Sequence, residues 1–174
     1  MARVTRPEPD LIEQPAADEP SPTFEDFFRA EHTRLLRALF LVTGTAHEAE
    51  DLMQEAFVKL WERWDRVQAM DDPTGYLYRT AMNALRSRAR RAATAARRIV
   101  ALGGAPDPFA GIEAKDEAAR ALAGLTRRQR LALVLTEYLG YSSEESAGLM
   151  GVKPATVRVL SHQGRQALQG VRDE

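Results

Sequence analysis

Residues 143–168, SEESAGLMGVKPATVRVLSHQGRQAL, contain two short helical patterns separated by Met150-Gly151-Val152. The second pattern opens at Pro154, and proline suits the first helical position because its missing N–H would have no partner there. Gly151 permits the positive φ of a tight turn. The apolar residues that a helix-turn-helix buries recur at the required spacing: Ala147, Met150, Val152, Val157 and Leu160. This stretch therefore predicts a helix-turn-helix motif.

The second helix of such a motif presents its outer face to DNA. Here that face carries Thr156, Arg158, Val159, His162 and Gln163. Threonine and valine suit thymine methyl groups, and Arg158 suits guanine or the backbone. Basic residues around the motif suit phosphates, which position a protein without specifying sequence: Arg127, Arg128, Lys153 and Arg165. An αα-hairpin with no DNA-binding function would show the same apolar spacing, so both interpretations stay open on this stretch alone.

The rest of the chain also indicates helices, each with a start or stop signal. Helical periodicity begins at Thr23 and ends at Gly44. Thr45 to Glu48 has the form of a capping box, opening a helix to about Arg66. Asp72-Pro73 pairs an N-cap with a first-turn proline. Further start signals at 126–129 and 142–145 precede two more helices.

These signals predict an all-α protein of two small helical domains joined by a flexible linker, the second a four-helix domain containing the helix-turn-helix. Residues 1–22 are rich in proline and acids, which predicts a disordered tail. The first domain is expected over 23–98, the glycine- and proline-rich linker over 99–114, the second domain over 115–170 and a short tail over 171–174.

The helix after Thr45 has apolar residues over roughly half its circumference, more than one core contact needs. Its opposite face carries Asp51, Glu55, Lys59 and Glu62. One interpretation is a helix buried within its own domain with a solvated acidic side. The other is that the outer edge, with Gln54, Glu55, Val58 and Trp61, docks a large partner. Periodicity alone favours the first.

Charge is segregated although the net charge is only −1. No Asp or Glu occurs from Pro73 to Pro106, and the helix there has a narrow stripe of five residues: Arg79, Asn83, Arg86, Arg90 and Arg97. A solvated face normally mixes charges of both signs. A stripe with four arginines and no acid is typical of a surface that follows nucleic-acid phosphates.

Several classes of protein are excluded by what the sequence lacks. Without cysteine there is no disulfide framework, thiolate metal site or cysteine nucleophile. No glycine-rich phosphate loop, metal-ligand cluster or nucleophile–base pair is recognisable, so we expect no enzyme, no catalytic residue, no metal and no cofactor. The start MARVTRPEPD has no hydrophobic signal and no apolar run reaches membrane-spanning length, which predicts a cytoplasmic protein.

Residues 23–170 resemble a sigma factor of the extracytoplasmic-function class, reduced to domains two and four. Asp51-Leu-Met-Gln54-Glu55-Ala-Phe57-Val-Lys-Leu-Trp61 resembles the core-polymerase-binding helix of that family. The run from Pro73 to Asn83 resembles its −10 helix, and 125–168 resembles its −35-binding domain. Tyr76 stands where the family usually has Trp. Further departures are Ser87, Lys153, Leu160, Gln163 and Gly164.

The resemblance implies a promoter-specificity subunit that is nucleoid-associated when in holoenzyme. Its partners would be promoter DNA and the coiled coil of the largest core polymerase subunit, with control by an anti-sigma protein left open. The implied core-binding residues are Asp51, Gln54, Glu55, Val58 and Trp61. The implied −10 contacts are Arg79, Asn83, Arg86 and Arg90, with a loop at 66–72 for a flipped base. The −35 contacts would come from the residues on and around the helix-turn-helix.

Two other functions remain as alternatives at this stage. A stand-alone helix-turn-helix regulator explains 143–168 but not the 51–61 motif or the arginine stripe. A helical interaction protein that does not bind DNA predicts no salt-dependent affinity for DNA at all.

Overall fold

The computed structural model describes residues 22–101 and 117–172, and this part of the chain contains helices and no strand. The N-terminal group comprises α1 (Phe24–Thr43), α2 (Ala46–Trp61), α3 (Trp64–Val67) and α4 (Pro73–Ala101). The C-terminal group comprises α5 (Glu117–Leu122), α6 (Arg127–Leu133), the π-helical turn η1 (Val134–Tyr138), α7 (Ser143–Met150) and α8 (Pro154–Arg172). The all-α prediction is confirmed; the predicted N-terminal tail and most of the predicted linker lie outside the described residues.

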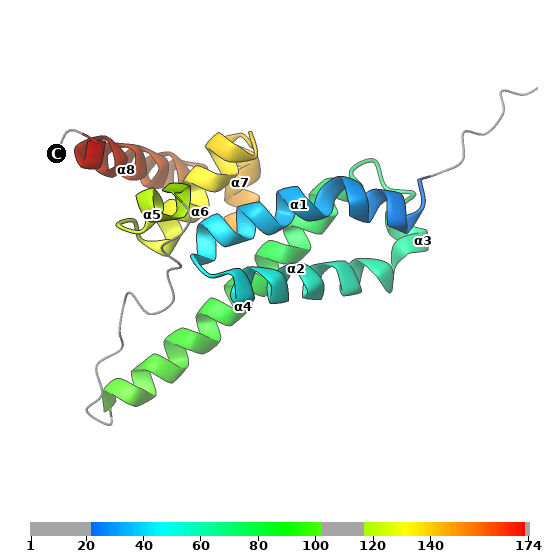
Figure 1. Ribbon diagram of the computed structural model, residues 1–174, viewed down its shortest axis with the longest axis horizontal. Helices are drawn as coiled ribbons and strands as arrows, with labels where there is room; N and C mark the ends of the chain where they lie inside the picture. Colours follow the sequence, from blue (N-terminus) through cyan, green and yellow to red (C-terminus); the bar gives the residue numbers. More distant parts are fainter. Residues whose placement is uncertain (1–21, 102–116, 173–174) are drawn as a thin grey trace, which may run out of the picture.

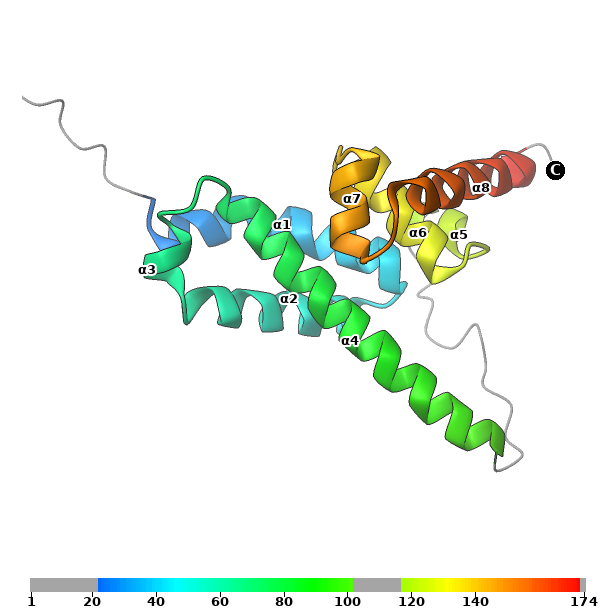
Figure 2. The same ribbon diagram turned by 180° about the vertical axis from the view of Figure 1, so that it is seen from behind.

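The N-terminal group is built on an antiparallel pair, α1 and α2, which α4 crosses (Figures 1 and 2). Aliphatic side chains from all three helices are fully buried between them, among them Leu35, Leu52, Leu60 and Leu77. The C-terminal part of α4 extends beyond the other helices (Figure 2). Asp72 caps α4 as expected, because its Oδ1 accepts a hydrogen bond from the Gly75 N–H at 2.7 Å.

In the C-terminal group, α8 packs against α6 and α7, and the predicted helix-turn-helix is formed by α7 and α8. Capping boxes at Thr126 and Ser142 begin α6 and α7 as the sequence predicts. Gly151 ends α7 with φ 66°, the left-handed conformation that favours glycine. The fully buried Val157 fixes α8 to this group.

The two groups pack against each other through a continuous apolar core. One cluster of buried residues runs from Leu35 and Leu39 in α1 to Leu135 in η1 and Met150 in α7. The contacts join α1 to α5, α6 and η1, and α4 to α7. Figure 1 shows the C-terminal group lying over one end of α1. The described residues therefore form one packed body with two helical parts.

Two local expectations for the second helix are wrong. The helix ends at Trp61 rather than near Arg66, and the chain turns before the short α3. This turn returns Trp64 to α1, where its ring lies 5.5 Å from Phe24 and 5.3 Å from Phe27 between centroids. Thr45 occupies the N-cap position of α2 but its side chain makes no capping hydrogen bond. The Glu48 carboxylate, expected in a capping box, instead pairs with Arg127 of α6.

The helix that begins at the predicted start signal 126–129 contains a change of hydrogen bonding. After α6 the chain forms η1, in which the Leu139 N–H donates to the Val134 carbonyl at 2.9 Å across five residues. Such a wide turn inserts one extra residue into a helix. Its end brings the Leu139 carbonyl to α1, where Arg34 donates to it at 3.1 Å.

Gly164, unexpected within a helix, has a packing reason. A β-carbon there would lie 2.7 Å from Leu133 Cδ1 and 3.1 Å from Leu133 Cγ, so glycine allows α8 to approach α6. We predict that Gly164→Ala destabilises the protein by about 1 kcal/mol or more, because overpacking outweighs the gain in helix propensity. The measurement is the free energy of unfolding from chemical denaturation, followed by circular dichroism.

Gly148→Ala is the matched control for this prediction. Gly148 also lies within a helix, but a β-carbon there would have no neighbour within 4 Å. This substitution should therefore stabilise the protein by about 0.5–1 kcal/mol through helix propensity alone. Equal stabilisation by both substitutions would contradict a packing role for Gly164.

Candidate polymerase and DNA interfaces

The outer face of α2 exposes two large apolar side chains. Val58 is 56% exposed and Trp61 is 57% exposed, although neighbouring Phe57 and Leu60 are buried. The Trp61 ring packs edge-on against Phe24 with 4.8 Å between centroids, which fixes its orientation at the surface. A groove beside it is lined by Phe24, Glu25, Phe28, Arg29 and Trp61. Exposed apolar side chains held rigidly beside a groove are typical of a protein-docking surface.

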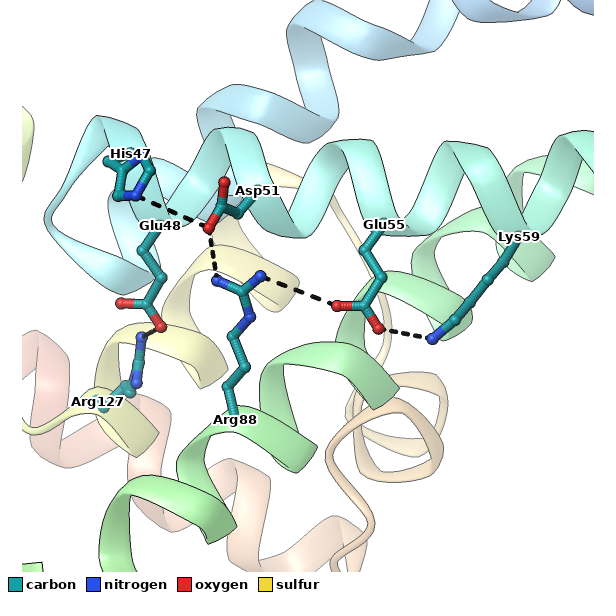
Figure 3. A network of polar contacts seen from close by, with 7 residues as sticks. All are labelled: His47, Glu48, Asp51, Glu55, Lys59, Arg88 and Arg127. Carbon is teal, nitrogen blue, oxygen red and sulfur yellow. Dashed lines mark hydrogen bonds and ion pairs between the residues drawn. The ribbon is translucent and has the colours of Figure 1, made fainter. Parts of the chain in front are cut away.

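Acidic side chains extend along the same helix and are paired with cations (Figure 3). Asp51 accepts a hydrogen bond from Arg88 Nη1 at 3.2 Å, and Glu55 accepts one from Lys59 Nζ at 2.6 Å. Arg88 Nη2 also lies 3.9 Å from Glu55 Oε2. The Lys59 hydrogen bond, with the charges of Lys59 and Arg88, lowers the pKa of Glu55 below its ordinary value, against the effect of partial burial. Gln54, the residue before Glu55, is exposed.

Arg88 is a functional candidate that the sequence-based prediction missed. It lies on α4 opposite the predicted arginine stripe and bridges α4 to two of the predicted docking residues, Asp51 and Glu55. Helical spacing alone puts Arg88 on the side of α4 opposite the stripe, because at 100° per residue positions 79 and 88 lie half a turn apart around the helix axis. The sequence does not show that Arg88 pairs with Asp51 and Glu55 of α2, because that pairing depends on how the two helices pack.

The predicted −10 residues share one side of α4. Arg79, Asn83 and Arg90 are exposed, and among the described residues Arg79 and Arg90 form no ion pair. Arg86 is only partly exposed; its Nη2 donates to Asn83 Oδ1, and its Nε is buried without a partner. The Arg97 side chain lies outside the described part of the chain. Three of the four predicted −10 residues are thus available on the surface.

A surface hollow lies next to the loop at 66–72, which is predicted to bind a flipped base. Residues 61–66 line it. Arg63 Nη1 donates to the Tyr76 hydroxyl at 3.3 Å, which links this turn to the first turn of α4. The loop at 66–72 therefore begins in α3 and ends at the Asp72 cap, and its role in binding a flipped base stays a prediction.

The predicted −35 residues are distributed over the outer side of the C-terminal group. Lys153, Arg158, Val159, His162 and Arg165 are exposed, and Thr156 is half-buried. Two of them make surface ion pairs: Arg158 with Glu144 at 3.2 Å and Arg165 with Glu137 at 2.7 Å. Exposed pairs of this kind contribute little and exchange readily for phosphate. Arg128 is exposed on α6, whereas Arg127 is half-buried against Glu48.

The unexpected Gln163 of the recognition helix also has a partner. Its Oε1 accepts a hydrogen bond from Gln129 Nε2 of α6 at 3.4 Å, and Leu160 packs against the core cluster. Gln163 therefore links α8 to α6, and Leu160 contributes to the core.

The structure brings the predicted residues together as three separate surfaces, on α2, on α4 and on the group from α6 to α8. Among the residues that the structure describes, no group of three His, Cys, Asp or Glu side chains is arranged to hold a metal ion. None of the described helices is both long and apolar enough to cross a bilayer.

Two family models match the chain along its length. The model for Sigma-70 region 2 matches residues 27–95, and the model for Sigma-70 region 4 matches residues 115–168. The first covers α1 to most of α4 and the second covers α5 to most of α8. The matched residues therefore include all three candidate surfaces.

Curated relatives are similar over most of this chain. The ECF RNA polymerase sigma factor SigE of Mycolicibacterium smegmatis is 29% identical over 164 residues, covering 85% of this chain and 61% of that protein. SigJ of Mycobacterium tuberculosis is 31% identical, covering 81% and 48%. The RNA polymerase sigma-E factor of Streptomyces avermitilis is 29% identical, covering 87% and 84%. The chain thus spans about half to three-fifths of the length of the first two.

Solved structures with the same fold include two complexes. The sigma factor RpoE of Bartonella quintana, crystallised with the anti-sigma factor NepR, aligns with a TM-score of 0.67 at 21% identity over 86% of this chain and 96% of that chain. CnrH, in complex with the cytosolic domain of CnrY, aligns with a TM-score of 0.57 at 24% identity over 86% and 87%. At these identities the likeness concerns the fold.

Proposed function

The chain belongs to the sigma-70 family, in its extracytoplasmic-function class, and on this premise we propose that it binds core RNA polymerase and directs transcription initiation at specific promoters. The observation that carries the proposal is the combination, within the matched regions, of a rigid exposed apolar face on α2 with separate basic faces on α4 and α8. A stand-alone helix-turn-helix regulator has no need of the first two surfaces.

The outer face of α2 would dock on the largest core subunit. Val58 and Trp61 supply apolar contact area at little entropic cost, because Trp61 is already held by Phe24. Asp51, Gln54 and Glu55 would supply the polar contacts around them. Lys59 and Arg88 hold the Glu55 carboxylate ionised and oriented, so a cation of the partner meets a prearranged anion.

The two basic faces would bind promoter DNA. Asn83 and the 66–72 loop would contact bases of the −10 element, and Arg79, Arg86 and Arg90 would bind its phosphates. The N-terminal half of α8 would enter the −35 major groove, where Arg158 can donate to guanine and Val159 can contact a thymine methyl. Arg127, Arg128, Lys153 and Arg165 would bind the flanking phosphates. His162 lies one turn after Arg158 on the same exposed side.

We propose that the protein acts in the cytoplasm, associated with the nucleoid when in holoenzyme, and that an anti-sigma protein is a further partner. The solved complexes with NepR and with the cytosolic domain of CnrY support this last proposal. Specificity is supplied by binding, and we assign no catalysed step to this chain.

The primary experiment is reconstitution with core RNA polymerase. The purified chain should co-elute with core and support run-off transcription from a library of genomic fragments without another activator. A chain that binds duplex DNA specifically but never binds core would contradict the sigma-factor proposal and favour a stand-alone regulator.

We predict that Val58→Glu lowers affinity for core about ten-fold or more, because it puts an uncompensated charge into the apolar centre of the docking face. Val58 is a better test than Glu55, whose reversal would also disturb Lys59 and Arg88. Competition against a labelled wild-type chain for core measures the effect. Ala121→Glu, an added charge at an exposed position of α5, is the control and should compete normally.

We predict different effects for two arginines of α8. Arg158→Ala should reduce discrimination among −35 sequences by about 1–3 kcal/mol at one base pair. Arg165→Ala should instead lower the affinity for all −35 sequences alike and make that affinity less dependent on salt. Holoenzyme binding to a panel of −35 variants at several salt concentrations measures both. Unchanged selectivity in Arg158→Ala would remove this residue from the base contacts. Core binding should be unaffected in both variants.

A further inference from the structure

One hydrogen bond within α4 fixes how a predicted base contact is presented. Asn83 and Arg86 lie one turn apart on the arginine stripe, and Arg86 Nη2 donates to Asn83 Oδ1. Asn83 is exposed, whereas Arg86 is only partly exposed. Side chains three residues apart are neighbours on a helix surface, so this bond is set by α4 itself.

The donor of this bond determines the orientation of the Asn83 amide. A guanidinium group has only N–H donors and no acceptor, so it can bind a carboxamide only through the oxygen. Turning the amide over would place two donors face to face. The Asn83 oxygen is therefore engaged by Arg86, and the NH₂ group is the part of the side chain left to meet a base.

No carboxylate of α4 competes with Asn83 for Arg86. The sequence has no Asp or Glu from Pro73 to Pro106, and Arg86 forms no ion pair within residues 22–101 and 117–172. Arg86 also differs from its neighbours on the stripe, because Arg79 and Arg90 are exposed and bind no other side chain of the described helices. The hydrogen bond to Asn83 thus gives Arg86 a role that the other arginines of the stripe lack.

An amide presented in this way distinguishes bases by their acceptors. Guanine O6 and thymine O4 accept hydrogen bonds, whereas adenine N6 and cytosine N4 are amino groups that donate them. An asparagine that turns freely pairs with adenine by accepting from N6 and donating to N7. With its oxygen engaged and a guanidinium beside it, Asn83 opposes an amino group, whose hydrogens carry positive charge. The arrangement therefore favours a base with a keto oxygen.

We propose that Arg86 is a positioning residue for −10 recognition: it holds the Asn83 oxygen, so that Asn83 donates to the DNA and selects guanine or thymine at the base it contacts. Arg79 and Arg90 keep the role of phosphate contacts, and the remaining donors of Arg86 can still meet a phosphate. The inference rests on the proposed function, because the selected base belongs to the −10 element.

The test uses holoenzyme and a promoter library with all four bases at each −10 position. Asn83→Ala identifies the position that Asn83 reads, because base preference is lost there. At that position the wild-type chain should prefer guanine or thymine over adenine or cytosine about three- to ten-fold, the value of one hydrogen bond. Sequencing of the polymerase-bound fraction measures the preference.

Three further variants separate positioning from direct contact. Arg86→Ala should abolish most of the preference and admit adenine, whereas Arg86→Lys, which can also donate to the Asn83 oxygen, should restore it. Asn83→Asp should favour adenine or cytosine at the same position, because a carboxylate only accepts. Arg90→Ala is the matched control and should lower affinity for all −10 sequences alike, as loss of a phosphate contact does.

Two results would overturn the proposal. A keto preference that persists in Arg86→Ala would show that Arg86 does not position Asn83. A wild-type preference for adenine or cytosine, or no base preference that depends on Asn83, would show that the amide is not presented to DNA through its NH₂ group.

The orientation of the amide can also be measured without polymerase. In the free chain the ¹³C signal of the Asn83 carboxamide should move upfield in Arg86→Ala, because the oxygen no longer accepts a hydrogen bond from a cation, and should move less in Arg86→Lys. An unchanged signal would overturn the hydrogen bond itself. Failure of the wild-type chain to bind core, with this shift present, would instead overturn the proposed function and the base selection with it.

Discussion

The burial of the inner face of α2 is the constraint on which the other surfaces depend. Leu52 and Leu60 are fully buried against α1 and α4, each stabilising the fold by about 1.5–3 kcal/mol as an upper estimate. With that face fixed, rotation of α2 is impossible, and Val58 and Trp61 must point outward. The same packing brings Arg88 of α4 under the acidic side of α2. The docking surface on α2 and its pairing with Arg88 are thus set by one aliphatic contact.

Most helix boundaries could be predicted because their signals are local. Gly44 ends α1 and Gly151 ends α7 with positive φ, and the capping boxes at Thr126 and Ser142 involve residues three apart. The start of α2 was also predicted correctly, at Thr45, but the capping hydrogen bonds expected there do not form. Thr45 and Glu48 have the spacing of a capping box, but a tertiary partner takes the carboxylate. A local pattern describes a helix end correctly only where no distant charge competes for it.

The candidate surfaces, too, were predictable only where the signal lies within a single helix. Exposure of Arg79, Asn83 and Arg158 follows from helical periodicity, which reports the side of a helix on which a residue lies. Pairing between helices does not follow from it, because Glu48 meets Arg127 only once two separate helical groups have packed. Gly164 is similar: sequence shows a weak helix former, and only the 2.7 Å approach of Leu133 Cδ1 shows why glycine is there.

Charge distribution explains how a chain of net charge −1 can present surfaces for a polyanion. The acids of α2 neutralise Lys59, Arg88 and Arg127, which therefore add little to the outer field in the free chain. The exposed Arg79 and Arg90 of α4 have no such acids beside them on their own helix, since none occurs from Pro73 to Pro106. Screening confines each effect to about 8–10 Å, so local pairing decides the surface potential and the total does not.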